Sequence, residues 1–344
     1  MRQDSGAPET QPQRGPTAGP TESVLWPDLE IVDPHHHLFH HGVEYLLEDL
    51  MSDTNSGHNV VQTIYVEDRW AYDDDAEAPE MMPVGEVARV AAIAEASESK
   101  AGATIAGIIG HADLRYGSRV GPVLDAMLEI SGGRLVGIRH ATAFSLGPGA
   151  VFNPACDRPN LTRDTTWREG FTELADRGLS FDASIWYPQL EELADLSECF
   201  PETPIIVDHL GIGMYFDDRD TVLDITQRSL ERLAGSANIK LKLGGIGWPR
   251  MSGAWKRPPT SEELAERWAP FVLWCIDTFG ADRCMFESNF PVDRQTCSYF
   301  VLWNAFKRIA ATRSSAERRA LFSGSARSIY RLGPNPNRRV PGHV

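Results

Sequence analysis

Short apolar runs alternate with longer amphipathic stretches along this chain from Leu29 onward, and this alternation decides its fold class. Runs rich in β-branched residues are typical of buried strands, and helical patterns between such runs indicate parallel βα units. The chain contains eight runs, the number of strands that closes a (β/α)8 TIM barrel, so we expect that α/β fold. The expected strands are 30–32, 62–66, 104–109, 135–138, 179–185, 204–207, 239–243 and 283–286.

Apolar residues between these runs recur at every third and fourth position, which predicts amphipathic helices. The segments that follow the strands, such as 40–58, are long, whereas most segments that lead from a helix into the next strand are short. Loops after strands emerge at the C-terminal face of a barrel, where active sites are built, so we expect the functional residues there. The expected helices are 84–96, 120–129, 167–177, 190–199, 222–234, 261–279 and 299–311.

We expect residues 26–333 to form a single domain, because a barrel of this type commonly uses ~250 residues and loop insertions account for the rest. Residues 1–25 are rich in Pro, Gly, Thr and Gln and contain no apolar segment, which predicts a disordered N-terminal tail rather than a secretory signal. Residues 334–344 are predicted to be a frayed C-terminal tail.

The formal net charge of −15 narrows the choice of partners. Such a surface repels nucleic-acid phosphates and anionic membranes, so we expect neither of them as a partner and expect a small-molecule substrate. No run of ~18 apolar residues is present that could form a transmembrane helix. The five cysteines are an odd number and no pair has metal-type CxxC spacing, which predicts reduced thiols in a cytoplasmic protein.

The strongest local signal is the segment Asp33-Pro34-His35-His36-His37, directly after the first expected strand. Side chains alternate along a strand, so His35 and His37 point to one side and His36 points to the other. Two imidazoles on one side of a strand end can share a metal ion or a polarised oxygen. A polar turn with solvated histidines is the alternative at this point.

Nearly every other expected strand also delivers an ionisable or amide side chain at its C-terminal end. A barrel built only for stability would not need this convergence, so the set as a whole predicts an active site. Each of these residues, taken singly, could instead have a structural role. An aspartate can pair with a lysine, and a histidine such as His111 can be hydrogen-bonded in the core. The side chains at these ends are Glu67, His111, Arg139, His140, Asp182, Trp186, Tyr187, Asp208, His209, Lys240, Lys242, Glu287 and Asn289.

Taken together and in their order along the chain, these motifs resemble those of the amidohydrolase superfamily, in particular its lactonase branch, which includes sugar-acid lactonases and 2-pyrone-4,6-dicarboxylate lactonase. The resemblance runs from about residue 29 to residue 332 and specifies the family but not a substrate. It implies a TIM barrel of the metal-dependent-hydrolase type that hydrolyses a cyclic ester or an amide with activated water. The motifs are Asp33-x-His35-x-His37, Glu67, Gly137-Ile138-Arg139-His140, Asp208-His209-x-Gly211, Lys242-Leu243-Gly244-Gly245 and Phe286-Glu287-Ser288-Asn289-Phe290-Pro291.

The resemblance also implies roles for individual residues. His35 and His37 match the histidine pair of the first strand, and His209 matches the histidine of the sixth strand. These three would hold one divalent metal such as zinc, or would hold the substrate carbonyl oxygen directly if the enzyme is metal-independent. The residues expected to bind substrate are His111, Arg139, His140, Trp186 and Tyr187, with Arg139 facing a substrate carboxylate.

Asn289 departs from the family pattern, because relatives usually end the eighth strand with an aspartate that ligates metal or accepts the proton of water. A neutral amide cannot act as a general base at neutral pH and is a weak ligand for zinc. We therefore expect Glu67 or Glu287 to act as general base and Asn289 to orient water or the oxyanion. Glu287 and Asn289 share one side of the strand only if the strand stays regular through both.

The favoured function is hydrolysis of a lactone or amide of a small carboxylated or aromatic compound. Barrels of this type often self-associate, so a homo-oligomer is one open alternative to a monomer. The first alternative is a metal-dependent decarboxylase or hydratase of aromatic acids on the same barrel, which release of carbon dioxide would distinguish. The second alternative, which the change at Asn289 keeps open, is a catalytically inactive barrel that only binds a ligand.

Overall fold

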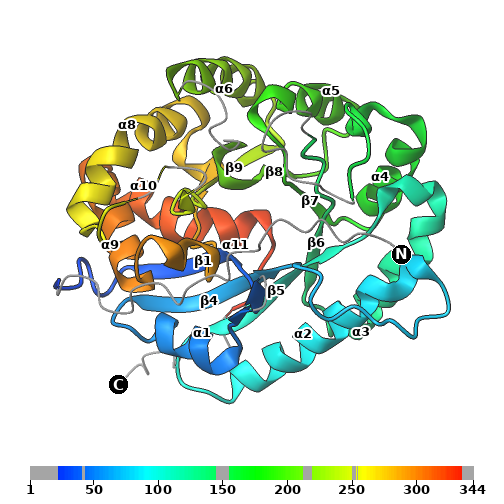
Figure 1. The fold of residues 1–344 in the computed structure, drawn as a ribbon, viewed down its shortest axis with the longest axis horizontal. Coiled ribbons are helices and arrows are strands. Elements are labelled where there is room, and N and C mark those ends of the chain that lie inside the picture. The colour runs from blue at the N-terminus through cyan, green and yellow to red at the C-terminus, as the bar shows by residue number, and fades with distance from the viewer. Residues whose placement is uncertain are drawn as a thin grey trace, which may run out of the picture.

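The computed structural model describes residues 22–40, 43–144, 155–211, 219–249, 253 and 255–334. At its centre lies one eight-stranded sheet, in which successive strands are neighbours and every hydrogen-bonded pair is parallel. Helices form a ring outside these strands (Figure 1), so the expected (β/α)8 barrel and the positions of its eight strands are confirmed. The strands are β1 Glu30–His36, β4 Asn59–Val66, β5 Thr104–His111, β6 Leu135–Arg139, β7 Ser180–Ala183, β8 Ile205–Val207, β9 Ile239–Leu243 and β10 Cys284–Phe286.

The barrel closes through the residues that follow β10. The backbone N–H of Asn289 donates to the carbonyl of His35 at 2.8 Å, and the N–H of His37 donates to the carbonyl of Phe290 at 2.7 Å. The buried carboxyl group of Asp33 adds a third connection, since it accepts from a backbone N–H of the same segment at 2.9 Å. These bonds place His35 and Asn289 next to each other at the C-terminal face.

The helices between the strands lie close to their expected positions, and local sequence explains where the longest one begins. Thr260 accepts a hydrogen bond from the N–H of Glu263, and the Glu263 side chain accepts from the N–H of Thr260, which is a capping box. The helices are α1 Leu47–Thr54, α2 Met82–Glu98, α3 Gly121–Ile130, α4 Thr165–Asp176, α5 Glu192–Cys199, α6 Arg219–Ala234, α8 Ser261–Phe279, α9 Tyr299–Ile309, α10 Ser315–Arg319 and α11 Ser325–Ile329.

Helix α1 corrects one expectation, because it lies inside the segment 40–58, which was predicted to be a loop. Its eight residues bury Leu50, Met51 and Thr54, and such a short helix does not let a 3.6-residue period stand out from the sequence. The same segment also contributes to a two-stranded antiparallel sheet of β2 (Phe39–His40) and β3 (Val43–Glu44). In the described part of the chain, no helix has the length and apolar character needed to cross a membrane.

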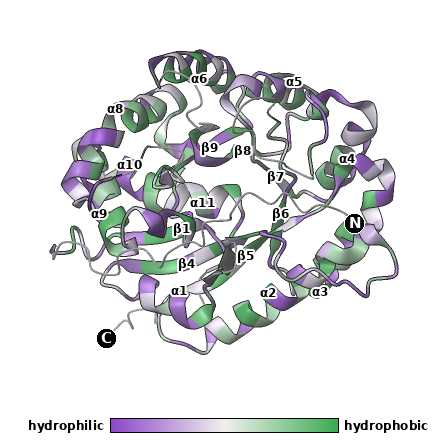
Figure 2. Ribbon diagram, in the orientation of Figure 1, coloured by the Kyte–Doolittle hydropathy of each residue, from purple (hydrophilic) through white to green (hydrophobic). Residues whose placement is uncertain are grey.

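Two apolar layers support the site. The larger layer lies between the strands and the surrounding helices. Strands β4 and β5 are mainly hydrophobic, whereas the helices carry both hydrophobic and hydrophilic residues (Figure 2). The smaller layer fills part of the barrel interior, where side chains of the strands pack against α11 and the residues after it. The smaller layer consists of Val32, Ile64, Val66, Ile109, Ile206, Met285, Ala326, Ile329 and Tyr330.

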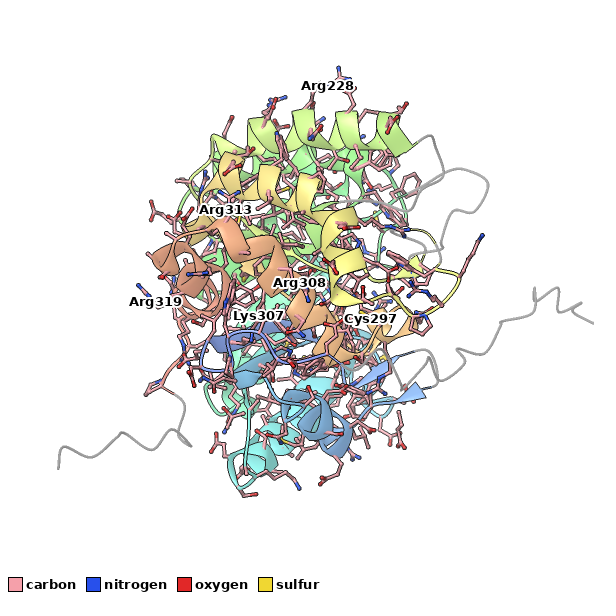
Figure 3. The ribbon with its side chains drawn as sticks, turned by 90° about the vertical axis from the view of Figure 1, so that its left-hand side faces the viewer. Arg228, Cys297, Lys307, Arg308, Arg313 and Arg319 are labelled. Carbon is pink, nitrogen blue, oxygen red and sulfur yellow. The ribbon has the colours of Figure 1, made fainter. Side chains whose placement is uncertain are left out.

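The N-terminal segment 22–29 packs against α8 and α9. Glu22 accepts from the N–H of Ser261 at 2.8 Å, and the buried ammonium of Lys307 donates to the carbonyl of Leu25 at 2.6 Å. Figure 3 shows Lys307 within the body of the molecule, whereas Arg228 points outward from α6. Of the tail expected at 1–25, residues 22–25 belong to this packed segment and residues 1–21 lie outside the described chain. Residues 335–344 of the expected C-terminal tail also lie outside it.

Candidate active site

Three histidines meet at the C-terminal end of the barrel, two from the end of β1 and one from the turn after β8. The ring centroid of His35 lies 5.0 Å from that of His37 and 4.7 Å from that of His209. The ring of His36 packs instead against Tyr65, with 6.0 Å between the centroids. The alternation of side chains along β1 therefore separates His36 from the other two histidines, as expected from the sequence.

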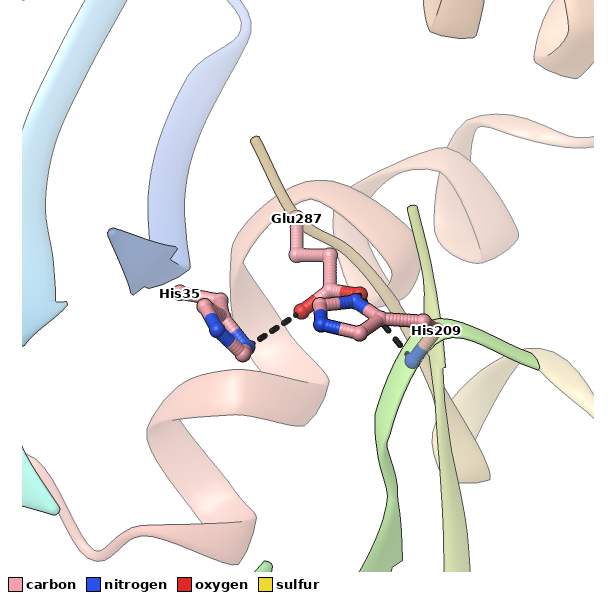
Figure 4. Close-up of side chains that lie close together, drawn as sticks. All are labelled: His35, His209 and Glu287. Atoms are coloured by element: carbon pink, nitrogen blue, oxygen red, sulfur yellow. Dashed lines mark hydrogen bonds and ion pairs between the residues drawn. The ribbon is translucent and has the colours of Figure 1, made fainter. Parts of the chain in front are cut away.

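Glu287 lies between His35 and His209 at the floor of the site (Figure 4). Its Oε2 atom lies 2.8 Å from Nδ1 of His35, and its Oε1 atom lies 2.7 Å from Nδ1 of His209. Burial acts to raise the pKa of Glu287, but the two imidazoles hold this pKa far below its usual range. An ionised carboxylate only accepts hydrogen bonds, so Nδ1 of His209 carries the proton and its Nε2 is left for another partner.

The geometry of these histidines fits a metal ion. Nδ1 of His37 donates to the carbonyl of Val66 at 2.9 Å, and Nε2 of His37 lies 3.3 Å from Nε2 of His35. Two imidazole lone pairs at this distance repel unless a proton or a cation lies between them. A tetrahedral zinc ion with bonds of about 2.0–2.1 Å separates its ligand atoms by about 3.3 Å, which matches this pair. Ligand atoms of His35, His209 and Glu287 also lie within 4.8 Å of one another.

A buried ammonium group lies beneath the histidines. Nζ of Lys242 lies 2.5 Å from Oδ2 of Asp182, 3.1 Å from Oδ1 of Asp208 and 3.2 Å from Nδ1 of His35. Burial alone would lower the pKa of Lys242, but the carboxylates raise this pKa above its usual range and keep the side chain charged. The hydroxyl of Tyr330 donates to Asp182 at 2.9 Å, which connects this ion group to the apolar interior. Lys242 lies at an expected strand end, but the sequence pattern predicted no role for it in the site.

Arg139, which was expected to bind a substrate carboxylate, is paired within the protein. Its Nε donates to Oε1 of Glu67 at 2.8 Å, its Nη2 donates to the backbone carbonyl of Glu67, and its Nη1 lies 3.8 Å from Asp208. Burial opposes the charge of Glu67, but Arg139 lowers the pKa of this carboxyl group overall. Glu67 is therefore a weak base, and it neutralises the arginine that was expected to attract an anion.

The buried ionisable groups around the site contain more acids than strong bases. Protonation of His209, or a divalent cation at the histidines, would offset the excess of negative charge. Burial acts to lower the pKa of His209, but Glu287 raises this pKa overall, which agrees with a local demand for positive charge. The acids are Glu67, Asp182, Asp208 and Glu287, and the strong bases are Arg139 and Lys242.

A cavity of about 260 Å³ opens at these groups, a size that suits a small ring compound. Five residues assigned to the site from the sequence line it, whereas His35 and Glu287 lie fully buried next to it. Two tryptophans, Trp186 and Trp248, contribute apolar wall. The lining residues are His37, Asp68, Arg139, Ala143, Ser184, Ile185, Trp186, Asp208, His209, Gly245, Trp248, Asn289 and Val292.

Three residues that were expected to bind substrate are absent from the described lining of this cavity: His111, His140 and Tyr187. Both ring nitrogens of His140 are used by the protein, since Nδ1 accepts from a backbone N–H at 3.1 Å and Nε2 donates to the carbonyl of Ala155 at 2.7 Å. Burial lowers the pKa of His140 to about 4, so this residue stays neutral. Nδ1 of His111 lies 3.0 Å from the carbonyl of Arg139, and Tyr187 is buried. We therefore interpret these three residues as structural.

Close backbone packing determines where His209 and Glu287 point. His209 has a left-handed φ of 55°. A Cβ atom at Gly245 would lie 2.0 Å from Nδ1 of His209, and a Cβ atom at Gly244 would lie 2.4 Å from Cγ of Glu287. The two glycines of the Lys242-Leu243-Gly244-Gly245 motif therefore leave the space that the histidine and the glutamate occupy.

Asp293 is a residue of the site that the sequence analysis did not identify. Its Oδ1 accepts from Nδ2 of Asn289 at 2.9 Å, and its Oδ2 accepts from the N–H of Gly247 at 2.7 Å. Burial raises the pKa of Asp293 to about 7. Asp293 lies in the short turn Val292–Gln295, where neither strand nor helix periodicity marks it. Its position one turn after Asn289 is the signal that could have indicated it.

Comparisons with known proteins agree with this geometry. The amidohydrolase family matches residues 32–332 of the chain. The chain is 33% identical over 328 residues to the uncharacterized protein y4mH of Sinorhizobium fredii, which covers 89% of this chain and 99% of that protein. It is 27% identical over 241 residues to an L-fucono-1,5-lactonase of Burkholderia multivorans, which covers 68% of this chain and 74% of that enzyme.

Among solved structures, an amidohydrolase from Burkholderia multivorans with bound zinc has a TM-score of 0.69 and 22% identity. The alignment covers 88% of this chain and 99% of that one, and it shows a shared fold. The family match, the barrel and the histidine arrangement agree with the resemblance noted in the sequence. The chain belongs to the amidohydrolase family.

Proposed function

We propose that this protein opens the ring ester of a small uncharged lactone by attack of water. The observation that carries this proposal is a set of three imidazoles, of which His37 and His209 line the cavity and His35 lies buried beside it, each with its Nδ1 next to a carboxylate or a carbonyl. A proton or a divalent cation held by Nε2 atoms fixed in this way can stabilise negative charge that develops on a carbonyl oxygen, which is usually the largest catalytic term. A relative named L-fucono-1,5-lactonase supports a lactone as the substrate.

We assign His35 and His37 to the carbonyl oxygen of the substrate. Their Nε2 atoms lie 3.3 Å apart, a separation that suits one shared proton or one divalent cation. When held by this pair, zinc would supply Lewis-acid polarisation of the carbonyl. Glu287 and the carbonyl of Val66 orient the two rings in either case, as partners of ligating histidines commonly do.

We assign proton transfer to His209. It lines the cavity, and Glu287 accepts from its Nδ1 at 2.7 Å, which leaves Nε2 to act on the substrate. Glu67 and Glu287 were expected to act as the base, but both have lowered pKa values because each is paired with a cation or with imidazoles. The pKa of His209 is raised overall, so this ring can take the proton of water and return it to the ring oxygen that leaves.

The charges around the cavity favour an uncharged substrate. Asp68 and Asp208 line the cavity, and Arg139 already donates to Glu67 through Nε and Nη2. A substrate carboxylate would have to compete with Glu67 for this guanidinium and would approach two acids. Hydroxyl groups would instead find acceptors in these carboxylates, and a ring face would find Trp186.

The test is a hydrolysis panel that contains uncharged aldonolactones, lactones that carry carboxylates, simple amides and aromatic carboxylic acids. We expect turnover of the uncharged lactones, and we expect His209→Gln to lower kcat by about 10²–10⁴-fold. His111→Gln is the matched control, because it changes a buried histidine outside the described cavity lining and should change kcat little. Carbon dioxide release without lactone hydrolysis would replace the proposal with a decarboxylase, and ligand binding without turnover would indicate an inactive barrel.

Elemental analysis of the purified protein, with and without chelator treatment, tests the metal separately. About one zinc per chain that depends on His35 and His37 would support the Lewis-acid form of the mechanism. Full activity in a chelated, metal-free protein would support the form in which the imidazoles act alone.

A further inference from the structure

We propose that Asp293 is a positioning residue, which holds the side-chain amide of Asn289 with its carbonyl oxygen toward the cavity. In this orientation Asn289 accepts a hydrogen bond from the attacking water and aims one of the lone pairs of the water at the lactone carbonyl. The inference rests on the proposed function, because it gives Asn289 a task in the same reaction. This positioning explains how the amide of Asn289 can act on water at a position where an aspartate was expected.

The amide of Asn289 is fixed from several directions. The backbone N–H of Asn289 donates to the carbonyl of His35 at 2.8 Å, and the backbone is left-handed with φ of 53°. The side-chain Nδ2 donates to Oδ1 of Asp293 at 2.9 Å. Because Nδ2 faces Asp293, Oδ1 is the end of the amide that remains for the cavity, which Asn289 lines.

Asp293 suits this task because its carboxylate serves two neutral donors. Oδ2 accepts from the N–H of Gly247 at 2.7 Å, and Oδ1 accepts from Asn289. The side chain is fully buried, and among the described residues no lysine or arginine forms an ion pair with it. An ionised Asp293 can only accept, so it permits one of the two orientations of the Asn289 amide.

The proton occupancy of Asp293 would then decide which end of the amide faces the water. The ionisable groups that face Asp293 are Glu287, which raises its pKa, His209, which lowers it, and the thiol of Cys297. With burial as the largest cause, the pKa of Asp293 is about 7. A protonated Oδ1 could donate to Asn289, and the amide would turn Nδ2 toward the cavity, where a donor cannot accept from water.

The experiment compares Asp293→Asn with the exchange Asn289→Asp/Asp293→Asn in lactone hydrolysis. Asp293→Asn removes the obligate acceptor, so we expect kcat to fall at least about tenfold while KM changes little. The exchange restores an acceptor at position 289, held by the amide at position 293, so we expect it to recover most of kcat. We also expect the part of the acid-side loss of kcat near pH 7 that comes from Asp293 to be absent from the exchanged protein, whereas the loss that comes from protonation of the base His209 remains.

A wild-type kcat and pH profile in Asp293→Asn would overturn the proposal. Equal losses in Asp293→Asn and in the exchange would also overturn it, because a purely structural role would produce them. If Asp293→Asn does not fold, Asn289→Gly tests the role of the Asn289 amide instead. Glycine tolerates the left-handed backbone at this position and removes the amide. That variant should lose kcat with little change in KM, and unchanged kcat would contradict the proposal.

A measurement without substrate separates this proposal from the proposed function. In protein labelled with ¹⁵N-asparagine, the side-chain amide signal of Asn289 should shift with a midpoint near pH 7, and this shift should vanish in Asp293→Asn. If the wild type hydrolyses no lactone but the signal titrates, the proposed function fails and the positioning stands. If the signal does not titrate in an active enzyme, the positioning fails alone.

Discussion

The barrel interior has two parts of opposite chemistry, although the same strands supply both. Beside α11 the interior is apolar, with Ile206 and Met285 packed against Ile329. Toward the C-terminal ends of the strands it contains Lys242, Glu287 and their partners, and Lys242 and Glu287 themselves are fully buried. Ile206 of β8 belongs to the apolar part and the side chain two residues later belongs to the charged part, so a single step of the strand period separates packing from chemistry.

The two parts of the interior should respond differently to a substitution. Burial and close packing stabilise the apolar part, so a small truncation there lowers the free energy of unfolding by a small amount. The charged part is held by pairing, so removing one partner leaves another charge buried without compensation. Stability and activity should therefore respond together in the charged part and separately in the apolar part.

The largest effect should come from Lys242→Met, which removes the ammonium from the charged part. Asp182 and Asp208 would remain buried without their cation, so we expect the free energy of unfolding to fall by about 3–5 kcal/mol. Activity should also be lost, because Lys242 lies 3.2 Å from Nδ1 of His35. Lys240→Met on the same strand is the control for urea unfolding, and an equal loss of stability in both variants would contradict the comparison.

The second effect is a dependence of stability on pH that involves Asp33. Burial raises the pKa of this carboxyl group to about 6 from 3.8, so the folded protein holds a proton that the unfolded chain releases. Stability should therefore fall as the pH rises from about 4 to 7, by about 3 kcal/mol from this group. Asp33→Asn should remove this slope in urea unfolding at several pH values. An unchanged slope would show that Asp33 does not titrate in this range.

The third effect tests the close packing at the boundary of the cavity. Gly245→Ala places a Cβ atom where Nδ1 of His209 lies, at 2.0 Å, so the imidazole must move. We expect kcat to fall by about 10²-fold, since small displacements of a reacting group are costly. Gly253→Ala is the matched control, because Gly253 also has a positive φ of 78° and no atom of the other described residues lies within 4 Å of the added Cβ atom. Equal activities of the two variants would indicate backbone strain rather than displacement of His209.

The smallest effect should come from Ile206→Val in the apolar part. Deletion of one buried methylene group should lower the free energy of unfolding by about 0.5–1.5 kcal/mol, with kcat unchanged. Ile130→Val is the control, because Ile130 is 48% exposed and its truncation should cost almost nothing. A clear loss of kcat in Ile206→Val would show that the two parts of the interior are coupled after all.

Part of the site could be predicted because it depends on local periodicity. The two-residue period places His35 and His37 on one side of β1, and the order of βα units brings His209 to the same face. The roles of Glu67 and Arg139 could not be predicted in this way, since their strands are separated by β5 and their pairing depends on strand tilt and side-chain reach.

The number of strands, their positions and the face at which His35 and His209 meet could be predicted from the chain, because they follow from its hydrophobic period and strand order. The roles of Lys242 as a buried cation and of Asp293 as the partner of Asn289 are visible only in the folded protein. These roles depend on which side chains are desolvated together when the barrel closes. The free energy of a charge in such a place is set by its neighbours in space and not by its neighbours in the chain.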